Sequence, residues 1–344
     1  MILSVLDQSP IPEGSTAAEA LHNTVDLAGL ADRLGYRRYW VAEHHATPAL
    51  ACAAPEILIG AIAARTSRIR VGSGGVMLPH YSPLKVAETF SSLAGLHPER
   101  IDLGLGRAPG TDPMTMLALQ RDRRQQAPDD FTEQLVELLA LLEDRMPAGH
   151  PFARLAATLP GRPEAPEPWL LGSSPQSAIW AGELGLPYSF ADFINPAGAV
   201  IADYRARFMD SERLGAPRVS VGVIAVCADS DEEAERLASS SRMMLSLLRQ
   251  GRLVEVPPVE KALRYLETRS RRPGGSGRRA VIGSPSTVRA GLEAVASEYG
   301  AEEVVVLTIT HDHEARRRSY ELIASAFGLE AADPPPHGSV AAAR

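Results

Sequence analysis

Short runs of β-branched residues alternate along the chain with segments of helical periodicity, which is the pattern of parallel βαβ units. The pattern predicts eight strands, at Ile2–Leu6, Arg38–Ala42, Ile69–Gly72, Ile101–Leu105, Trp169–Leu171, Pro187–Ala191, Val219–Val226 and Val304–Thr308. The first four strands begin at residues 2, 38, 69 and 101, a spacing that fits one βα unit each. Eight strands with matching helices favour a closed (β/α)8 TIM barrel over an open, doubly wound α/β sheet.

Helical segments follow most of these strands, and a capping box at Thr16-x-x-Glu19 opens the first of them. The rhythm is interrupted twice, which predicts insertions after strands four and seven. The first insertion contains a helix near Asp130–Glu143, and the second runs from about Arg249 to Ala280. Residues 1–330 are therefore expected to form a single domain.

Two segments have the composition of irregular structure. The basic, glycine-containing segment Lys261–Arg279, which has no clean helical continuation after Thr268, is interpreted as a solvated surface loop, with a mobile lid over an anionic ligand as the alternative. The tail at Ala331–Arg344 is rich in proline and alanine, and it is expected to be disordered.

Composition narrows the class of protein. The chain of 344 residues is 45% hydrophobic and 22% charged, which is ordinary for a globular enzyme with a substantial core. Its net charge of −7, with no long basic stripe, disfavours a nucleic-acid partner. No basic region precedes the first strand and no apolar run could span a bilayer, so neither a signal peptide nor a membrane anchor is expected. Cys52 and Cys227 stand far apart, which fits a reducing cytoplasm.

Barrel chemistry is expected where strands end and loops begin, and Glu43-His44-His45 stands at the end of the second predicted strand. Alternation along an extended strand would send Glu43 and His45 to one side and His44 to the other. A histidine here could move protons near neutral pH, and a carboxylate beside it could fix its tautomer. Ordinary hydrogen-bonded loop histidines explain the tripeptide equally well. A metal site is the weaker alternative, because no second His/Asp cluster follows another strand.

Glycines crowd the end of the third strand, in Gly72-Ser73-Gly74-Gly75. Glycine in a strand marks either a bulge or a close approach of the backbone to a ligand. A flat aromatic ring lying against this backbone and a purely structural bend both account for the pattern.

Arg107 ends the fourth strand, directly after Gly104-Leu105-Gly106. The glycine spacing does not match a dinucleotide fingerprint, and Pro109 interrupts the helix that such a site requires. The guanidinium group could hold a phosphate in a fork, or it could form an ordinary surface salt bridge.

A serine-rich helix start follows the fifth strand, in the sequence Gly172-Ser173-Ser174-Pro175-Gln176-Ser177. Ser174 is expected to be the N-cap, with Pro175 in the first helical position. Capping requires only Ser174. The surplus hydroxyls of Ser173 and Ser177, together with the N–H groups and dipole of the helix N-terminus, favour an anion such as phosphate.

Three motifs, in order along the chain, resemble the bacterial luciferase-like flavin monooxygenases, a superfamily of TIM barrels. They are residues 39–45 (YWVAEHH), residues 72–79 followed by Ser82-Pro83, and residues 101–107 (IDLGLGR). The resemblance extends from Ile2 to about Phe327. Its first and third motifs look like the single-component, FMN-using branch more than the deazaflavin (F420) branch. The luciferase proper has a reactive cysteine where this chain has Gly106, so the resemblance does not imply light emission.

The resemblance implies roles residue by residue. His44 would handle protons beside the flavin, and Glu43 and His45 would be its polar partners. Gly74-Gly75 falls where the family often has a non-prolyl cis peptide behind the flavin ring. The grip on the flavin phosphate would come from Arg107, Ser173, Ser174 and Ser177.

The implied activity is that of a monooxygenase. Reduced FMN from a separate flavin reductase would react with O2 to a C4a-hydroperoxide, which would oxygenate an organic substrate by hydroxylation, epoxidation or a Baeyer–Villiger step. The composition, rich in Ala, Arg and Pro, points to a GC-rich genome and to an antibiotic-type secondary metabolite as substrate. The alternatives are a non-catalytic flavin-binding protein, an F420-dependent oxidoreductase of the same superfamily, and a metal-dependent hydrolase using His44 and His45.

The family usually dimerises through helices two and three, which correspond here to residues 55–65 and 83–96. Five apolar side chains would be available for burial between subunits, namely Ile57, Leu58, Ile62, Phe90 and Leu93. A homodimer is therefore expected, although the sheet of the barrel itself could bury the same surface.

Overall fold

Parallel strands form a single sheet in the computed structural model, which describes residues 1–107, 112–120, 123–124, 129–196, 198–268 and 280–330. The strands of the described residues are β1 (Ile2–Asp7), β2 (Arg38–Val41), β3 (Arg70–Met77), β4 (Ile101–Gly106), β5 (Glu167–Gly172), β6 (Tyr188–Phe190), β7 (Val219–Cys227), β8 (Ala280–Gly283) and β9 (Glu303–Leu307). Their order in the sheet is β6-β5-β4-β3-β2-β1-β9-β7-β8.

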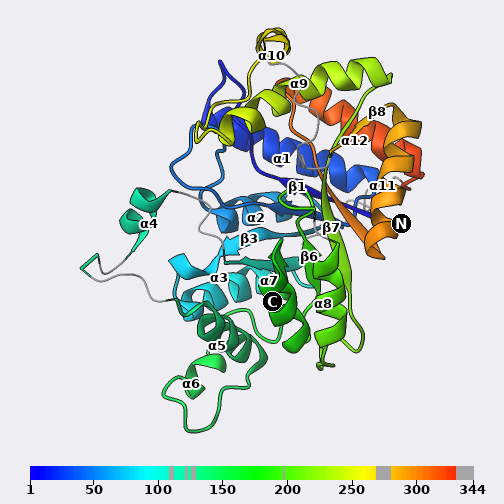
Figure 1. The fold of residues 1–344 in the computed structure, drawn as a ribbon. Coiled ribbons are helices and arrows are strands. Elements are labelled where there is room, and N and C mark those ends of the chain that lie inside the picture. Colours follow the sequence, from blue (N-terminus) through cyan, green and yellow to red (C-terminus); the bar gives the residue numbers. More distant parts are fainter. Residues whose placement is uncertain (108–111, 121–122, 125–128, 197, 269–279, 331–344) are drawn as a thin grey trace, which may run out of the picture.

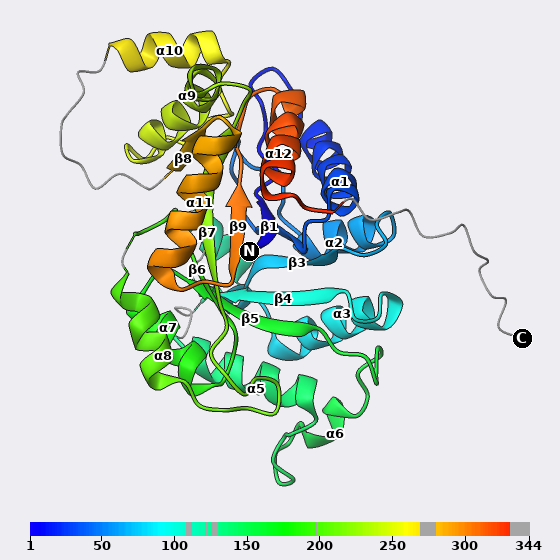
Figure 2. The same ribbon diagram turned by 90° about the vertical axis from the view of Figure 1, so that its right-hand side faces the viewer.

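The sheet closes on itself because β6 also pairs with β7. The first seven strands and β9 therefore form a ring of eight, with helices packed around the outside (Figures 1 and 2). This ring confirms the predicted (β/α)8 barrel, and each predicted strand overlaps one of its members.

One strand, β8, was not predicted. It pairs with residues 224–227 at the end of β7, beyond the residues 219–221 that pair with β6, so it lies outside the closed ring. Its sequence, AVIG, is too short to show the alternation from which a strand is recognised.

Helices follow the strands and pack on the outer face of the sheet. In the described residues they are α1 (Ala17–Leu34), α2 (Pro55–Ala63), the short 3-10 helix η1 (Leu78–His80), α3 (Pro83–Leu96), α4 (Pro113–Leu119), α5 (Phe131–Glu143), α6 (Ala153–Ala156), α7 (Pro175–Glu183), α8 (Ala199–Arg207), α9 (Asp231–Leu248), α10 (Val259–Glu267), α11 (Pro285–Tyr299) and α12 (His313–Phe327). The predicted capping box of α1 is present, because Thr16 and Glu19 hydrogen-bond reciprocally.

Additional elements lie in the two long intervals between barrel strands. Helices α4, α5 and α6 separate β4 from β5, and α9, α10, β8 and α11 separate β7 from β9. In Figure 1, α4 extends away from the barrel on the side opposite the N-terminus. In the segment Lys261–Arg279, for which a loop was expected, residues 261–267 belong to helix α10, and residues 269–279 lie outside the described residues. The tail at 331–344, for which disorder was expected, also lies outside them.

Strand β3 continues through the glycines at which it was predicted to end. A Cβ atom at Gly72 would lie 2.5 Å from the carbonyl oxygen of Asp102, and one at Gly75 would lie 2.8 Å from that of Gly104. The backbones of β3 and β4 are therefore too close for side chains at these positions, and the register between them shifts at Gly74 and Val76. Close packing between strands explains these glycines without any ligand.

The interior of the barrel is apolar along its length and charged at its base. Trp40 and Trp169 meet edge to face, with ring centroids 5.3 Å apart. At the base, Arg38 donates to Asp102 at 2.8 Å, and its hydrogen bonds to Glu167 and Glu303 are each 3.1 Å long. The guanidinium group is thus neutralised inside the ring, as a buried charge requires.

The outer helices correct one expectation about the dimer surface. Four of the five apolar side chains expected to be available, Leu58, Ile62, Phe90 and Leu93, are buried against the protein's own core. Only Ile57 is exposed, and it is accompanied by Leu96 at the end of α3. The barrel sheet has taken up this surface because both helices lie directly over it. Among the described residues, no helix combines the length and apolar character that a bilayer crossing requires.

A buried ion pair joins the last helix to the first strand. Arg316 of α12 donates to Asp7 at 2.6 Å, and Asp7 also accepts from the hydroxyl of Tyr39 and from the N–H of Ser9. Burial by itself would raise the pKa of Asp7, but the charge of Arg316 and these hydrogen bonds hold it below its usual value. The carboxylate therefore stays ionised and fixes α12 against the barrel.

We expect Arg316→Met to lower the free energy of unfolding by about 3–5 kcal/mol, because it leaves the Asp7 carboxylate buried without its partner. The matched control is Arg318→Met on the same helix, whose side chain is 52% exposed. That substitution should cost about 1 kcal/mol or less, since exposed ion pairs contribute little. Urea unfolding of both variants checks the prediction, and equal losses would show that the buried pair has no special role.

Candidate active site at the barrel mouth

The carboxylate of Glu43 holds together the residues that follow β2 and β3. It is fully buried and accepts three hydrogen bonds, from the N–H of Met77 at 2.9 Å, from the hydroxyl of Tyr81 at 2.7 Å and from Nε2 of His45 at 2.6 Å. The contact with His45 confirms that Glu43 and His45 lie on the same side, although β2 ends earlier, at Val41. Glu43 therefore holds these three groups in position.

The imidazole of His44 has a nitrogen without a hydrogen-bond partner in the described residues. The backbone N–H of His44 donates to the carbonyl of Cys52 at 2.8 Å, but its Nδ1 is buried without a hydrogen-bond partner in the described residues. Burial lowers the pKa of His44 to about 4. A hydrogen bond with the Ala42 backbone raises this pKa and the charge of His45 lowers it, but burial has the largest effect. The imidazole is therefore neutral at neutral pH, and it has a position free to bind a ligand.

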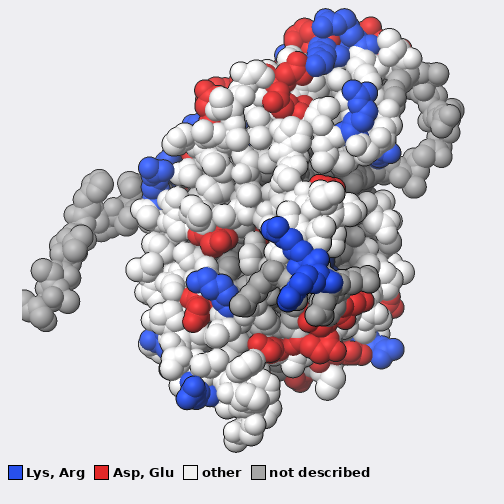
Figure 3. All heavy atoms as spheres, turned by 90° about the vertical axis from the view of Figure 1, so that its left-hand side faces the viewer, with Lys and Arg blue, Asp and Glu red and all other residues white. Residues whose placement is uncertain are grey.

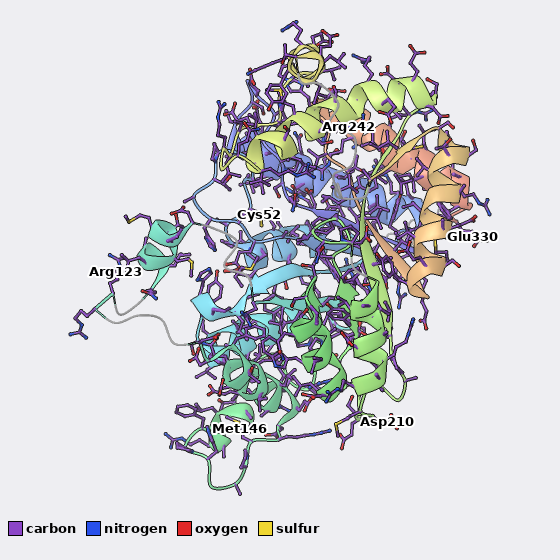
Figure 4. The ribbon with its side chains drawn as sticks, viewed as in Figure 1. Cys52, Arg123, Met146, Asp210, Arg242 and Glu330 are labelled. Atoms are coloured by element: carbon purple, nitrogen blue, oxygen red, sulfur yellow. The ribbon has the colours of Figure 1, made fainter. Side chains whose placement is uncertain are left out.

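Cys52 supports His44 from the interior and is not itself reactive. Figure 4 shows it inside the molecule, whereas Arg123 and Met146 lie at the periphery. Burial raises the pKa of the Cys52 thiol to about 12, so the thiolate is scarcely populated.

The peptide between Gly74 and Gly75 is cis, as the resemblance implied. A Cβ atom at Gly74 would lie 2.6 Å from Leu6 and 3.0 Å from Trp40, both of which fill the barrel interior. No side chain can therefore project inward here. Residue 77, which follows this bend, then supplies the N–H that binds Glu43.

Arg107 lies beside helix α7. Its guanidinium group stands 5.6 Å from the centre of the Trp180 ring, and the side chain is exposed. Within the described residues it forms no ion pair, so the surface salt bridge considered above is not present. The charge is held next to α7 by the aromatic ring and is available to an anion.

The start of α7 has the predicted cap, with Ser174 accepting from the N–H of Ser177 at 3.4 Å and Pro175 in the first turn. The hydroxyl of Ser177 is already committed, because it donates to the carbonyl of Ser174 at 2.8 Å and lies 2.9 Å from the Tyr188 hydroxyl. Ser173 and Ser174 are more exposed, so they are the hydroxyls that an anion at this helix start would meet.

These groups lie on or after four neighbouring strands. Because β2, β3, β4 and β5 pair in that order, His44, Arg107 and Ser174 lie beyond the carboxyl ends of β2, β4 and β5, and Gly74-Gly75 lies within β3, between β2 and β4. Figure 3 shows this side of the molecule, where basic and acidic residues are separated by broad uncharged areas.

An apolar wall closes the opposite side of the mouth. Met244 and Leu245 of α9 pack with Val254 and Val256 against the cluster that contains Trp40. The backbone of Val256 is bonded on both sides to the loop after β1, to Ile11 and Glu13 at 2.8 Å each. This part of the second insertion is therefore fixed in place. The lid considered above would include residues 269–279, which the structure does not describe.

Sequence reasoning missed two residues of the site, Tyr81 and His80. Tyr81 binds Glu43, and the ring of His80 stands edge-on to His45 with centroids 5.7 Å apart. Both belong to η1 or directly follow it, and no periodic pattern marks a single 3-10 turn. The nearest signal was Ser82-Pro83, which identified the start of α3 and hence a loop at the barrel mouth.

The two histidines of the tripeptide do not assemble a metal site. His45 is bonded to Glu43, while the free Nδ1 belongs to His44. Within the described part of the chain, no three His, Cys, Asp or Glu side chains come together as metal ligands would.

The site thus combines a (β/α)8 barrel with a histidine that is neutral at neutral pH and a serine-capped helix start at the carboxyl ends of the strands. The family model for luciferase-like monooxygenases matches residues 1–303, and the chain belongs to that family.

The relatives span nearly the whole chain. It is 41% identical over 323 residues to a luciferase-like monooxygenase of Escherichia coli, covering 93% of this chain and 95% of that protein. It is 38% identical over 338 residues to N-acetyl-S-alkylcysteine monooxygenase of Bacillus subtilis, covering 94% and 97%. The crystal structure of apo-MsnO8 superposes with a TM-score of 0.87 at 43% identity, covering 96% and 98%.

More distant structures share the fold alone. The oxygenating constituent of 3,6-diketocamphane monooxygenase from Pseudomonas putida, solved with FMN, superposes with a TM-score of 0.73 at 20% identity, covering 97% of this chain and all of that one. An F420-dependent secondary alcohol dehydrogenase superposes with a TM-score of 0.62 at 14% identity, covering 96% and 99%. The fold thus occurs with both cofactors.

We expect one histidine resonance of the labelled protein to titrate near pH 4, and His44→Gln to remove it. An unperturbed histidine titrates near 6.5, so the unfolded chain takes up its proton first as the pH falls, and this site lowers stability between pH 6.5 and about 4. NMR titration is the measurement. A His44 midpoint at or above 6.5 would contradict the burial argument.

Proposed function

We propose that this protein is an FMN-dependent monooxygenase that uses reduced FMN and O2 to oxygenate an organic substrate. The observation that carries the proposal is the buried, partnerless Nδ1 of His44, and the cis Gly74-Gly75 peptide on the neighbouring strand accompanies it. A buried polar atom without a partner is costly, and a ligand at the mouth would satisfy it. Reduced FMN, when bound, supplies the reaction with O2 and the transfer of oxygen.

The residues of the mouth fit a flavin in two ways. The backbone at Gly74-Gly75 carries no side chain that could obstruct a flat ring. Arg107 and the start of α7 with Ser173 and Ser174 offer a cation, hydroxyls and N–H groups for a phosphate. Ser177 completes the proposed grip only if its hydroxyl exchanges its present partners.

In this proposal the protein orients the flavin and the substrate, excludes water and holds or moves one proton. His44 is neutral and can donate or accept a hydrogen bond at the reacting centre. Glu43 positions His45 and the loop that begins at Met77 and does not itself transfer a proton, because its oxygens are occupied. The apolar wall of Met244, Leu245 and Val256 keeps the mouth dry.

FMN is favoured over F420 by the relatives. The N-acetyl-S-alkylcysteine monooxygenase and the E. coli protein, at 38% and 41% identity, carry monooxygenase names, whereas the F420-dependent dehydrogenase is only 14% identical. The alternative of a non-catalytic flavin-binding protein does not explain the buried, neutral His44. Without a dinucleotide fingerprint, electrons would come from a separate flavin reductase. An antibiotic-type secondary metabolite remains our proposed substrate.

Rapid mixing of the protein–FMNH2 complex with aerated buffer tests the proposal. We expect bound flavin to regain its oxidised spectrum more slowly than free FMNH2, with delayed release of H2O2. His44→Ala should accelerate both by about tenfold or more, the effect of ~1.4 kcal/mol on a barrier. Reoxidation as fast as that of free flavin in the unaltered protein would support the binding-protein alternative. Metal analysis of the same sample tests the hydrolase.

The phosphate grip gives a separate prediction. Arg107→Gln should weaken FMN binding by about tenfold or more, because a charge-assisted hydrogen bond is lost. Riboflavin, which has no phosphate, should bind equally well to both forms. Fluorescence titration with the two flavins makes the comparison, and equal losses for both would place Arg107 elsewhere than at the phosphate.

We also propose that the protein forms a homodimer through α2 and α3. Ile57 and Leu96 are 71% and 74% exposed, and both line a groove of about 520 Å³ between these helices. Exposed apolar side chains beside a groove are typical of a subunit interface.

Ile57→Asp should shift the protein from dimer to monomer, because it puts a charge at the centre of this surface. Met209→Asp is the control, since Met209 is 61% exposed outside the groove. Light scattering after gel filtration gives the molar mass. A dimer that persists in the Ile57 variant would place the interface on another face.

A further inference from the structure

A polar cavity lies at the base of the barrel, at the end opposite His44. It has a volume of about 810 Å³ and is lined by the segments that precede β2, β3, β4, β5 and β7. Figure 2 views the molecule from this side, with the N-terminus near the centre. The volume is within the range of small-molecule sites.

The lining is strongly cationic. It contains six arginines, Arg37, Arg38, Arg68, Arg70, Arg100 and Arg218, but only two carboxylates, those of Glu99 and Glu167. Three further carboxylates, Asp32, Asp102 and Glu303, interact with these arginines from behind. Positive charge remains in excess even when all five are counted.

Three of the arginines form a fixed floor. Arg38, Arg70 and Arg218 all contact Glu167, at 3.1, 3.3 and 2.8 Å. Burial opposes ionisation of Glu167, but the charges of Arg38, Arg218 and Arg70 hold its pKa well below the usual value. Arg38 and Arg218 also stand 4.7 and 5.2 Å from the centre of the Trp169 ring. The floor is thus assembled before any ligand arrives.

Other arginines at this cavity keep a donor or a charge that no carboxylate of the described residues binds. The Nε of Arg218 is buried without a hydrogen-bond partner in the described residues. In the same part of the chain, no hydrogen bond or ion pair involves the exposed side chain of Arg37. Arg100 bonds only to neutral acceptors, the carbonyls of residues 63, 66 and 69 and the hydroxyl of Thr66, so its charge is not cancelled by a carboxylate.

We propose that this base cavity binds a small molecule carrying several oxyanion groups, phosphoryl or carboxylate. Guanidinium groups match such oxyanions in geometry and charge. Arg37 and Arg218 would donate hydrogen bonds, and the other arginines would supply the potential. The site is separate from the proposed flavin phosphate site, because it lies at the amino ends of the strands and Arg107 lies at a carboxyl end.

Calorimetric titration of the FMN-saturated protein tests the proposal, with pyrophosphate and citrate as probes and NaCl matching the ionic strength. We expect binding that Arg37→Gln weakens about tenfold, since it removes a hydrogen bond to a charged group. Arg249→Gln, which removes an exposed charge far from the cavity, should leave binding unchanged. Tighter pyrophosphate identifies a phosphoryl ligand, and tighter citrate identifies a carboxylate.

Three results would overturn the base site. The first is that neither probe binds. The second is an equal loss of affinity in the Arg37→Gln and Arg249→Gln variants. The third is that Arg107→Gln loses binding of the probes while Arg37→Gln retains it. The last result would assign all oxyanion binding to the mouth. Because the Arg107 comparison can be made without FMN, failure of flavin binding does not obscure the outcome. Arg218→Gln gives a second measurement at the floor, with urea unfolding to confirm that the variant is folded.

Discussion

The close approach of β3 and β4 governs the geometry of the mouth. Glycines on both strands bring the backbones together, since a Cβ at Gly104 would overlap the carbonyl of Ser73 and one at Gly75 would reach Gly104. The register shift that results carries β3 on to Met77, whose N–H binds the Glu43 carboxylate. Glu43 in turn holds His45 and Tyr81, and His44 lies between Glu43 and His45 in the chain. A packing constraint between two strands therefore positions the segment that carries the candidate catalytic histidine.

The two ends of the barrel handle charge in opposite ways. At the base, Arg38 and its neighbours are paired with carboxylates, so full charges persist inside the protein. Toward the mouth, the walls are apolar and burial keeps His44 neutral. Ion pairs at the base hold the frame of the barrel together. Near the mouth, the apolar walls keep the surroundings of the neutral His44 dry.

Prediction from the sequence succeeded where one local rule was sufficient. The capping box at Thr16, the N-cap at Ser174 and the eight barrel strands were all recognised, because each depends on residues a few positions apart. Family resemblance added the cis peptide at Gly74-Gly75. Four of the apolar residues of α2 and α3 were misassigned as free surface, since helical periodicity does not say which layer covers an apolar face. β8 and Tyr81 left too short a pattern to detect.

The sequence by itself determined the class of fold and the family. Those properties follow from periodicity, caps and motifs, which are short-range in the chain. Only the tertiary structure decided what each site residue does. It occupied Glu43 with three donors and left Nδ1 of His44 without one, and it gathered arginines from four separate segments around one cavity. The reason is physical, because burial and hydrogen-bond partners depend on contacts between strands and loops far apart in sequence.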